Sequence, residues 1–441
     1  MKDSITSRIL FFIVVCIGSF GIIHAETVTS LDGTLIPDDS SEKSLQIAID
    51  ALKRGQVADC RRLTAKLTSN SDRLPHADVL VATWLFKSHE LDAATKLMEY
   101  AAKTNPPRPD IHALFAEVAF SQGRSFDAWT HLLAAEAATS PENWSPEYSQ
   151  QWRTNIRVSK GVVAAARGDW KTTHRLLKAF REHESVDVNV LLTLSQAAFH
   201  LGNMEQAETD LRRAATLQPG VCIPELMLAQ WFASINRSDE VERWFAKGGR
   251  ETYEHSDQIR LAHIRWLITQ NRIDDAADVI KSARKNPSTR TDMHFLSAIV
   301  DLSRGDYDSA EARLAKLHQQ LPENVVISNQ LALALVESQD EGKRSRALQI
   351  ATANAKAAPE SVDLVASLAW IQFRLGDIAS ASAISDAILH QGGTLNRDSC
   401  FFIATIQEKR GRQRQAKALF DASRDSAGKF LNAYRTDPPN E

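Results

Sequence analysis

Cysteine is one of the residues that this sequence has little of, with four in 441 residues. No CxxC pair occurs, which excludes a zinc ribbon or a dithiol redox motif. Besides Cys16 near the N-terminus, the chain has Cys60, Cys222 and Cys400, which stand far apart in the sequence. We therefore expect these three thiols to fill small apolar spaces between helices and to form no disulfide.

An excess of charge of one sign is also missing. Lys and Arg total 52 against 55 Asp and Glu, which gives a formal net charge of −3. The chain contains no run of five like charges. Because nucleic-acid binding requires a clustered basic excess, we expect no nucleic-acid partner.

Local signatures of catalysis are absent from the sequence as well. We find no HExxH motif, no glycine-rich phosphate loop and no GxSxG motif. The 13 histidines are scattered along the chain, so we expect neither a metal site nor a cofactor. An enzyme whose site is assembled from distant residues stays open as an alternative, although no motif supports it.

One long hydrophobic run occurs, near the N-terminus. Lys2 and Arg8 precede an apolar stretch over residues 9–23, and Ala25 follows it. This order is typical of a secretory signal peptide, and the stretch is shorter than the ~20 residues that span a bilayer. Cleavage after Ala25 predicts a periplasmic or other extracytoplasmic protein, whereas an uncleaved segment 1–25 predicts an anchor in the inner membrane. Residues 26–40 and 437–441 are expected to be flexible ends.

What the sequence does have is a repeat of 34 residues. Gly168, Gly202 and Asn236 lie 34 positions apart, and so do Asn271 and Gly305. Five residues after most of these turn positions stands an alanine, as also after Gly342 and Gly376: Ala207, Ala276, Ala310, Ala347 and Ala381. A fixed period in this range predicts a solenoid of helical repeats.

The segment 188–219 shows most clearly what one repeat is. Its first half has apolar residues at helical spacing, and Gly202 ends that helix because glycine adopts the left-handed conformation without a Cβ clash. A second helix then runs from about Ala207 to Leu217, and Pro219 ends it. We expect the two antiparallel helices to cross near Ala207, where a larger side chain would push them apart.

This hairpin resembles the tetratricopeptide repeat family, and the residues that carry the resemblance are Ala198, Phe199, Gly202, Ala207, Leu211, Ala214 and Pro219. Residues 368–377 are even more typical. The resemblance implies an all-α, right-handed α-solenoid of about eleven helix-turn-helix repeats. Their expected turns are Gly55, His89, Gly123, Gly168, Gly202, Asn236, Asn271, Gly305, Gly342, Gly376 and Gly411.

The spacing of these turns predicts the organisation of the chain. Repeats one to three cover residues 41–138, and repeats four to eleven, with a C-terminal capping helix, cover residues 154–436. Between them lies an aromatic insertion over residues 139–153. The insertion and residues 248–256, around Gly248 and Gly249, are two places where the solenoid could divide, although one continuous array is the favoured expectation.

The resemblance also implies where a partner binds. In this family the first helix of each repeat lines a concave groove, and the position six residues before the turn is Gln196, Gln230 and Arg265 in three consecutive repeats. Their groove neighbours are expected to be Leu192, Leu226 and Leu261. Glutamine and arginine carry several donors, which can bind the carbonyls of an extended peptide or a carboxylate. The alternative is that they are ordinary solvated residues.

The insertion supplies a second candidate site. Trp144, Tyr148 and Trp152 lie in a stretch that also contains prolines, and exposed aromatic residues anchor many protein partners. The alternative is a segment that folds back and covers the neighbouring hairpin.

The sequence therefore predicts a non-enzymatic scaffold or adaptor of the cell envelope that binds a protein or peptide partner. Two alternatives share the same fold. One is a membrane-anchored assembly factor that keeps residues 1–25. The other is an accessory protein for polysaccharide or protein export, which Trp144 and Trp152 would support by stacking on sugars.

Overall fold

The computed structural model describes residues 39–183, 186–249, 256–282 and 290–424. Over these residues the chain forms helices and no strand, in eleven consecutive pairs. In ten of these pairs the two helices pack closely against each other. The predicted all-α helical-repeat fold of eleven hairpins is therefore confirmed.

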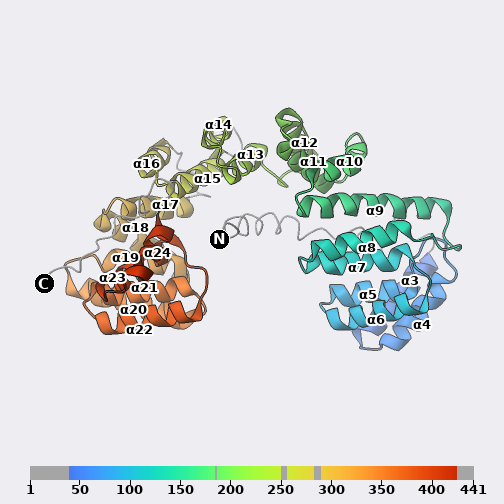
Figure 1. Ribbon diagram of the computed structural model, residues 1–441, viewed down its shortest axis with the longest axis horizontal. Helices are drawn as coiled ribbons and strands as arrows, with labels where there is room; N and C mark the ends of the chain where they lie inside the picture. The colour runs from blue at the N-terminus through green and yellow to red at the C-terminus, as the bar shows by residue number, and fades with distance from the viewer. Residues whose placement is uncertain (1–38, 184–185, 250–255, 283–289, 425–441) are drawn as a thin grey trace. The chain divides into compact units, whose positions relative to one another are not determined.

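The chain divides into two compact units, with unit 1 ending at Leu228 and unit 2 beginning at Ala229. This boundary lies inside helix α13, Pro224–Ser234, and coincides neither with the aromatic insertion nor with residues 248–256. The helices of unit 1 are α3 Asp39–Lys53, α4 Val57–Thr68, α5 Ala77–Lys87, α6 Leu91–Thr104, α7 Pro109–Ser121, α8 Ser125–Ala137, α9 Pro146–Ala166, α10 Trp170–Leu177, the 3₁₀ turn η1 Lys178–Phe180, α11 Val188–His200 and α12 Met204–Leu217 (Figure 1).

Unit 2 continues the same alternation of first and second helices. Its helices are α14 Ser238–Gly248, α15 Ser256–Thr269, α16 Ile273–Ser282, α17 Arg290–Ser303, α18 Tyr307–Gln320, α19 Val325–Leu335, α20 Glu341–Ala357, α21 Val362–Arg374, α22 Ile378–Gln391, α23 Arg397–Lys409 and α24 Gln413–Ser423.

The turns explain why each hairpin folds locally. In ten of the eleven, the expected turn residue has a left-handed backbone, for example Gly202 with φ of 83° and Asn236 with φ of 57°. Around Gly202, the amide of Asn203 donates to the carbonyl of Ala198 at 2.8 Å, and the amide of Gly202 donates to Phe199 at 3.0 Å. These two bonds satisfy the last carbonyls of the first helix, which otherwise have no partner.

The crossing point of each hairpin is closed by one small residue. The residues at this position are 0–1% exposed in all eleven hairpins: Cys60, Ala94, Ala128, Thr173, Ala207, Val241, Ala276, Ala310, Ala347, Ala381 and Ala416. Their burial confirms the expected crossing of the two helices near Ala207. Cys222 and Cys400 are also buried as free thiols, as expected.

The ninth turn differs from the expectation, because Gly342 does not form it. Helix α20 begins at Glu341, so Gly342 already lies in the first helical turn. Asp340 caps this helix, and its carboxylate accepts a hydrogen bond from the amide of Lys343 at 3.0 Å. The extra residues lengthen both the connection, which spans residues 336–340 against 375–377 in the next hairpin, and the second helix, which has 17 residues in α20 against 14 in α22.

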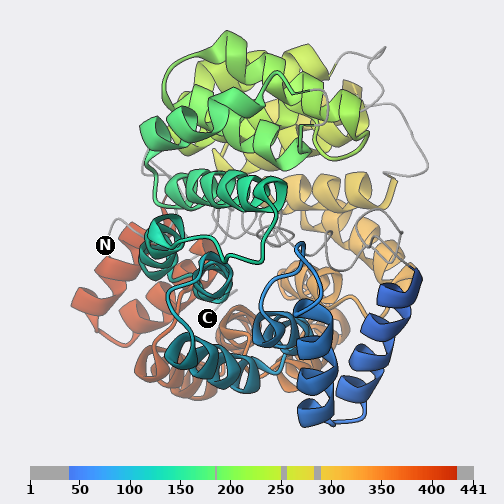
Figure 2. The same cartoon turned by 90° about the vertical axis from the view of Figure 1, so that its right-hand side faces the viewer.

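The aromatic insertion is half helix, whereas the sequence suggested a separate segment over residues 139–153. Helix α9 begins at Pro146 and is 21 residues long. Ser145 caps it by accepting a hydrogen bond from the amide of Tyr148 at 3.2 Å, and proline suits the first helical position. Figure 2 turns unit 1 toward the viewer and shows α9 in green across the middle of the picture.

First helices of successive hairpins pack side by side within each unit, as α5, α7, α9 and α11 do in unit 1. Their aligned faces therefore form a continuous surface. The predicted signal segment 1–25, the linker up to residue 38, and the capping helix and tail after residue 424 lie outside the described residues. Within the part of the chain that the structure describes, no helix is both long and apolar enough to cross a membrane.

Candidate partner-binding surfaces

The six predicted groove residues do not come together in one unit. Leu192 and Gln196 lie half-buried on α11, and Leu226 lies on α13, all in unit 1. In unit 2, Leu261 is buried on α15, whereas Gln230 and Arg265 are exposed.

Arg265 has a partner of its own. Its guanidinium forms an ion pair with Asp292 of the neighbouring first helix α17 at 3.1 Å, and both side chains are more than half exposed. Such a pair stabilises by less than about 1 kcal/mol. A partner carboxylate that binds Arg265 would therefore displace only a weak contact.

A continuous face of the first helices of unit 1 is the best-defined surface. Residues three, six and ten positions before each turn share one face of a helix, because they are spaced by three or four residues. We call this surface the inner face of unit 1, and on α5, α7, α9 and α11 it comprises Val79, Thr83, Phe86, Ala113, Glu117, Phe120, Val158, Val162, Ala165, Leu192, Gln196 and Phe199.

The inner face of unit 1 is apolar apart from Thr83, Glu117 and Gln196. Phe86 and Phe120 are half-buried and keep part of their rings accessible. Burial raises the pKa of Glu117 to about 7, and the positive charge of the nearby Lys87 acts in the opposite direction. Burial likewise lowers the pKa of Lys87. A carboxyl in this setting favours a cationic partner group, which would stabilise its charged form.

Sequence reasoning did not identify Glu117 as a binding residue. Its only signal is that it is the one acid among the apolar residues at the groove positions of unit 1. A raised pKa cannot be inferred from a period of 34 residues, because it depends on how deeply the neighbouring helices bury the carboxyl.

The structure resolves the two alternatives for the aromatic insertion in favour of a segment that folds back. Trp144, Tyr148 and Trp152 are all buried. The rings of Trp144 and Trp152 stack with centroids 5.4 Å apart, and Tyr148 meets Trp144 edge-on at 4.9 Å. The indole of Trp144 donates to the carbonyl of Leu74 at 3.1 Å. These aromatic residues therefore form part of the core of unit 1.

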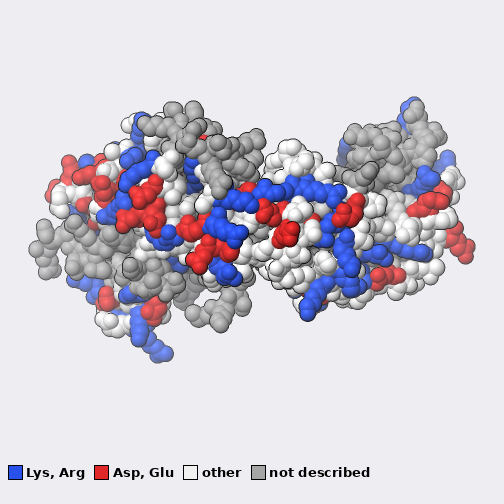
Figure 3. Space-filling model, turned by 90° about the horizontal axis from the view of Figure 1, so that it is seen from above, with Lys and Arg blue, Asp and Glu red and all other residues white. Residues whose placement is uncertain are grey.

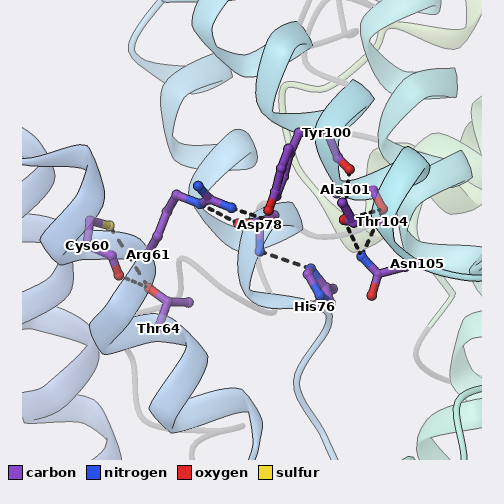
Figure 4. A network of polar contacts seen from close by, with 9 residues as sticks. All are labelled: Cys60, Arg61, Thr64, His76, Asp78, Tyr100, Ala101, Thr104 and Asn105. Carbon is purple, nitrogen blue, oxygen red and sulfur yellow. Dashed lines mark hydrogen bonds and ion pairs between the residues drawn. The ribbon is translucent and has the colours of Figure 1, made fainter.

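A polar groove of about 600 Å³ lies where the first three hairpins and the α8–α9 connection meet. Arg61 donates two hydrogen bonds to Asp78, at 2.7 and 3.0 Å, and its guanidinium lies 4.9 Å from the centroid of the Tyr100 ring (Figure 4). The amide of Asp78 donates to His76 at 3.2 Å. Because its arginine and carboxylate satisfy each other, this network joins hairpins and offers little charge to a ligand.

The described ranges contain no cluster of side chains that could bind a metal ion. Over residues 39–424, apart from the gaps given above, no group of three or more His, Cys, Asp or Glu side chains could hold a metal ion. His112 and His131 stack with centroids 6.0 Å apart, and burial lowers the pKa of both imidazoles. This pair packs together with Phe115 between α7 and α8.

No protein-family model matches the sequence, and no curated protein matches it. Among solved structures, PilW, a widely conserved type IV pilus biogenesis factor, is 12% identical with a TM-score of 0.34 over 50% of this chain and 99% of that chain. Yeast Tom70 is 11% identical with a TM-score of 0.37 over 87% of this chain and 91% of that chain. The tetratricopeptide domain of P58(IPK) is 15% identical with a TM-score of 0.25 over 77% of this chain and 99% of that chain.

These solved structures have low sequence identity and low TM-scores, so the class of the protein is inferred from its own hairpins. Left-handed turns, buried small residues at the crossings and first helices packed side by side are all present. The described part of the chain is an all-α helical-repeat protein built of tetratricopeptide-like hairpins.

Proposed function

We propose that this protein is a non-enzymatic scaffold or adaptor that binds a protein or peptide partner on the inner faces of its hairpins. The observation that carries the proposal is the inner face of unit 1, which is apolar except for three residues and includes the half-buried Phe86 and Phe120 and one carboxyl, that of Glu117. Apolar surface that stays accessible in a helical array is a common site for a protein partner.

The chemistry of this face indicates what kind of peptide it would bind. Phe86, Phe120 and Leu192 would contact apolar side chains of the partner, and Gln196 would bond to its backbone. Glu117 would pair with a lysine or arginine of the partner. We therefore expect a partner segment in which a basic residue stands among apolar ones.

We propose further that the protein works in the cell envelope, either exported or anchored by its N-terminus. The support is the order of charges and apolar residues in the segment 1–25, which lies outside the described residues. An intact-mass measurement on protein isolated from cells separates the two forms. Loss of residues 1–25 would favour an exported protein, whereas their retention would favour a membrane-anchored assembly factor.

In-cell crosslinking followed by mass spectrometry tests the binding surface. The wild type would be compared with two variants shown to fold by circular dichroism, one carrying Glu117→Gln in unit 1 and one carrying Gln196→Ala, Gln230→Ala and Arg265→Ala. A matched control carries Arg243→Ala, Gln319→Ala and Gln391→Ala, which change exposed residues on second helices. We expect the partner to be lost from either or both groove variants and kept by the control.

Two results would contradict the proposed function. Equal crosslinking in all variants would move the binding site away from the inner faces. A catalytic activity of the purified chain that one substitution abolishes would show that the protein is an enzyme. A role in polysaccharide export loses its main support, because the rings of Trp144 and Trp152 are buried against each other instead of being free to stack on a sugar.

A further inference from the structure

The fourth hairpin carries a concentration of positive charge that the composition of the chain conceals. Residues 153–181 contain eight lysines or arginines and a single acid, Asp169, although the whole chain has a net charge of −3. Lys160 pairs with Glu136 at 2.5 Å, and Arg181 pairs with Asp210 at 3.0 Å. These two cations are therefore neutralised within the fold.

Four other cations of this hairpin lie on its surface. Lys171, Arg175 and Lys178 are spaced by four and three residues, so they share one face of α10 and η1. Arg157 is exposed on α9, which packs against α10. All four are exposed, and within the described residues none of them forms an ion pair.

Exposed apolar residues lie next to these cations. Phe126 and Leu133 stand three and ten residues after the left-handed Gly123, the same places that Lys171 and Lys178 hold after Gly168. Equivalent positions of consecutive hairpins face the same side of a repeat array. The exposed fraction is 70% for Phe126 and 44% for Leu133.

One of the exposed apolar residues contacts a further cation of the fourth hairpin, Arg167. The guanidinium of Arg167, the residue after α9, lies 4.5 Å from the ring centroid of Phe126 and 5.0 Å from that of Trp129 on α8. In the view from above, lysine and arginine side chains form a band across the middle of the picture, with Asp and Glu side chains between them (Figure 3). We call the surface formed by Phe126, Leu133, Arg157, Lys171, Arg175 and Lys178 the basic outer face.

We propose that the basic outer face docks the protein onto the surface of an anionic lipid bilayer. The unpaired cations complement anionic headgroups, and the exposed phenylalanine and leucine enter the boundary between headgroups and acyl chains. Nucleic acid would use the cations and could stack on Phe126, but it offers nothing apolar for Leu133. This docking uses the second helices α8 and α10 together with Arg157 of α9, and it is independent of partner binding on the inner faces.

Vesicle binding of the full chain tests the proposal. The vesicles contain phosphatidylcholine alone or with about one third phosphatidylglycerol, and the variant carries Lys171→Gln, Arg175→Gln and Lys178→Gln. A matched control carries Lys356→Gln, Lys409→Gln and Lys417→Gln, which remove the same charge from exposed positions of unit 2. We expect the first variant to bind anionic vesicles roughly 100-fold more weakly than the wild type and the control to bind nearly as well.

A fluorescent label keeps the test valid if the N-terminal apolar segment itself inserts into vesicles. An environment-sensitive dye is attached at Phe126→Cys or, as a control, at Ile47→Cys, which is exposed on α3 at the other end of unit 1. Both labelled proteins also carry Cys16→Ser, because Cys16 lies in the apolar segment. The native thiols of Cys60, Cys222 and Cys400 are buried. We expect the dye at position 126 to shift to the blue with anionic vesicles only, and the shift to shrink at high salt because screening weakens the attraction.

Three results would overturn the proposal. Equal losses in the two triple variants would mean that net charge alone governs binding. An unchanged emission at position 126 with anionic vesicles would mean that this face does not meet the bilayer. Binding to duplex DNA or to an acidic polypeptide that is lost in the first variant, together with unaltered vesicle binding, would assign the basic outer face to another anionic macromolecule.

Discussion

Unit 1 and unit 2 are built of the same hairpin, but they join consecutive hairpins in different ways. In unit 1 most acids of the joining ion pairs are buried: Asp78 pairs with Arg61, Asp210 with Arg181 and Glu225 with Arg212. The exception is Glu136, the partner of Lys160, whose side chain is 55% exposed. Asp110, which pairs with Arg108 at 2.9 Å and accepts the amide of His76 at 2.7 Å, has no exposed side-chain surface.

In unit 2 the corresponding pairs run along the edge of the turns and are open to solvent. The pairs are Glu242–Arg272, Asp274–Arg304, Glu311–Lys343 and Asp386–Arg412. The side chain of Asp274 is 92% exposed. Exposed pairs of this kind contribute about 0–1 kcal/mol and weaken with salt, whereas breaking a buried pair leaves an uncompensated charge.

The comparison shows that hairpins with the same backbone fold can be joined by interactions of very different strength. Unit 1 depends on a few buried polar contacts, each of which is costly to lose. Most ion pairs between hairpins of unit 2 are exposed and contribute little to its stability. Unit 2 therefore depends more on apolar packing, such as the cluster around Trp370 and Phe402.

The largest expected effect is that of Asp110→Ala in unit 1. The substitution leaves the mostly buried Arg108 without its carboxylate and the His76 amide without its acceptor. We expect the free energy of unfolding of unit 1 to fall by about 3–5 kcal/mol. Hydrogen exchange of α7 amides would measure it within this unit. A loss below about 1 kcal/mol would remove the contrast between the units.

One pair in unit 2 should behave like those of unit 1. Arg374 and Glu337 are each only 1% exposed and lie 2.7 Å apart. Glu337→Ala should destabilise unit 2 by about 3 kcal/mol, measured by hydrogen exchange of α21 amides. The double variant Glu337→Met, Arg374→Met should recover most of this loss, because it removes both buried charges. If the double variant is as unstable as the single one, the loss of stability does not come from a buried charge left without its partner.

The free energy of unfolding of unit 1 should depend on pH through the ionisation of Glu117. Its pKa is raised from 4.5 to about 7 in the folded state. The unfolded chain therefore ionises Glu117 at lower pH than the folded chain, and the free energy of unfolding falls as the pH rises from 4.5 through 7. Glu117→Gln should therefore stabilise unit 1 by about 1–3 kcal/mol at pH 8, and this gain should vanish near pH 4.5. Urea unfolding of both proteins across this range would measure it. A gain that is independent of pH would assign the effect to packing instead of ionisation.

The smallest expected effect belongs to Asp274→Asn in unit 2. The variant breaks the exposed pair with Arg304, and we expect a loss below about 1 kcal/mol that disappears at high salt. Hydrogen exchange of α16 and α17 amides at two salt concentrations would check this. A salt-independent loss of several kcal/mol would mean that the turn-edge pairs hold the hairpins together after all.

Several elements of the fold were predictable from the sequence for a clear physical reason. Gly202 and Ala207 illustrate it, because a left-handed turn favours residues without a bulky Cβ and a helix crossing favours a small side chain. Gly342 shows the limit of the same reasoning. Glycine permits a left-handed turn without requiring one, and here Asp340 caps the following helix before the glycine is reached.

The surfaces were less predictable than the hairpins. Trp144 and Trp152 were equally compatible with an exposed anchor and with a buried segment, since burial depends on which hairpin lies beneath them. The basic outer face escaped detection because its cations are spaced by three and four residues and do not form a run. Only the helix brings Lys171, Arg175 and Lys178 to one side.

The sequence by itself determined the period of 34 residues, the number of hairpins and the small residue at each crossing. These features are local, because each depends on a few residues within one repeat. Only the tertiary structure decided that the division into units falls inside α13, that Asp110 is buried while Asp274 is exposed, and that Glu117 titrates near neutral pH. Burial and desolvation arise from the packing of neighbouring hairpins, and a single repeat does not contain that information.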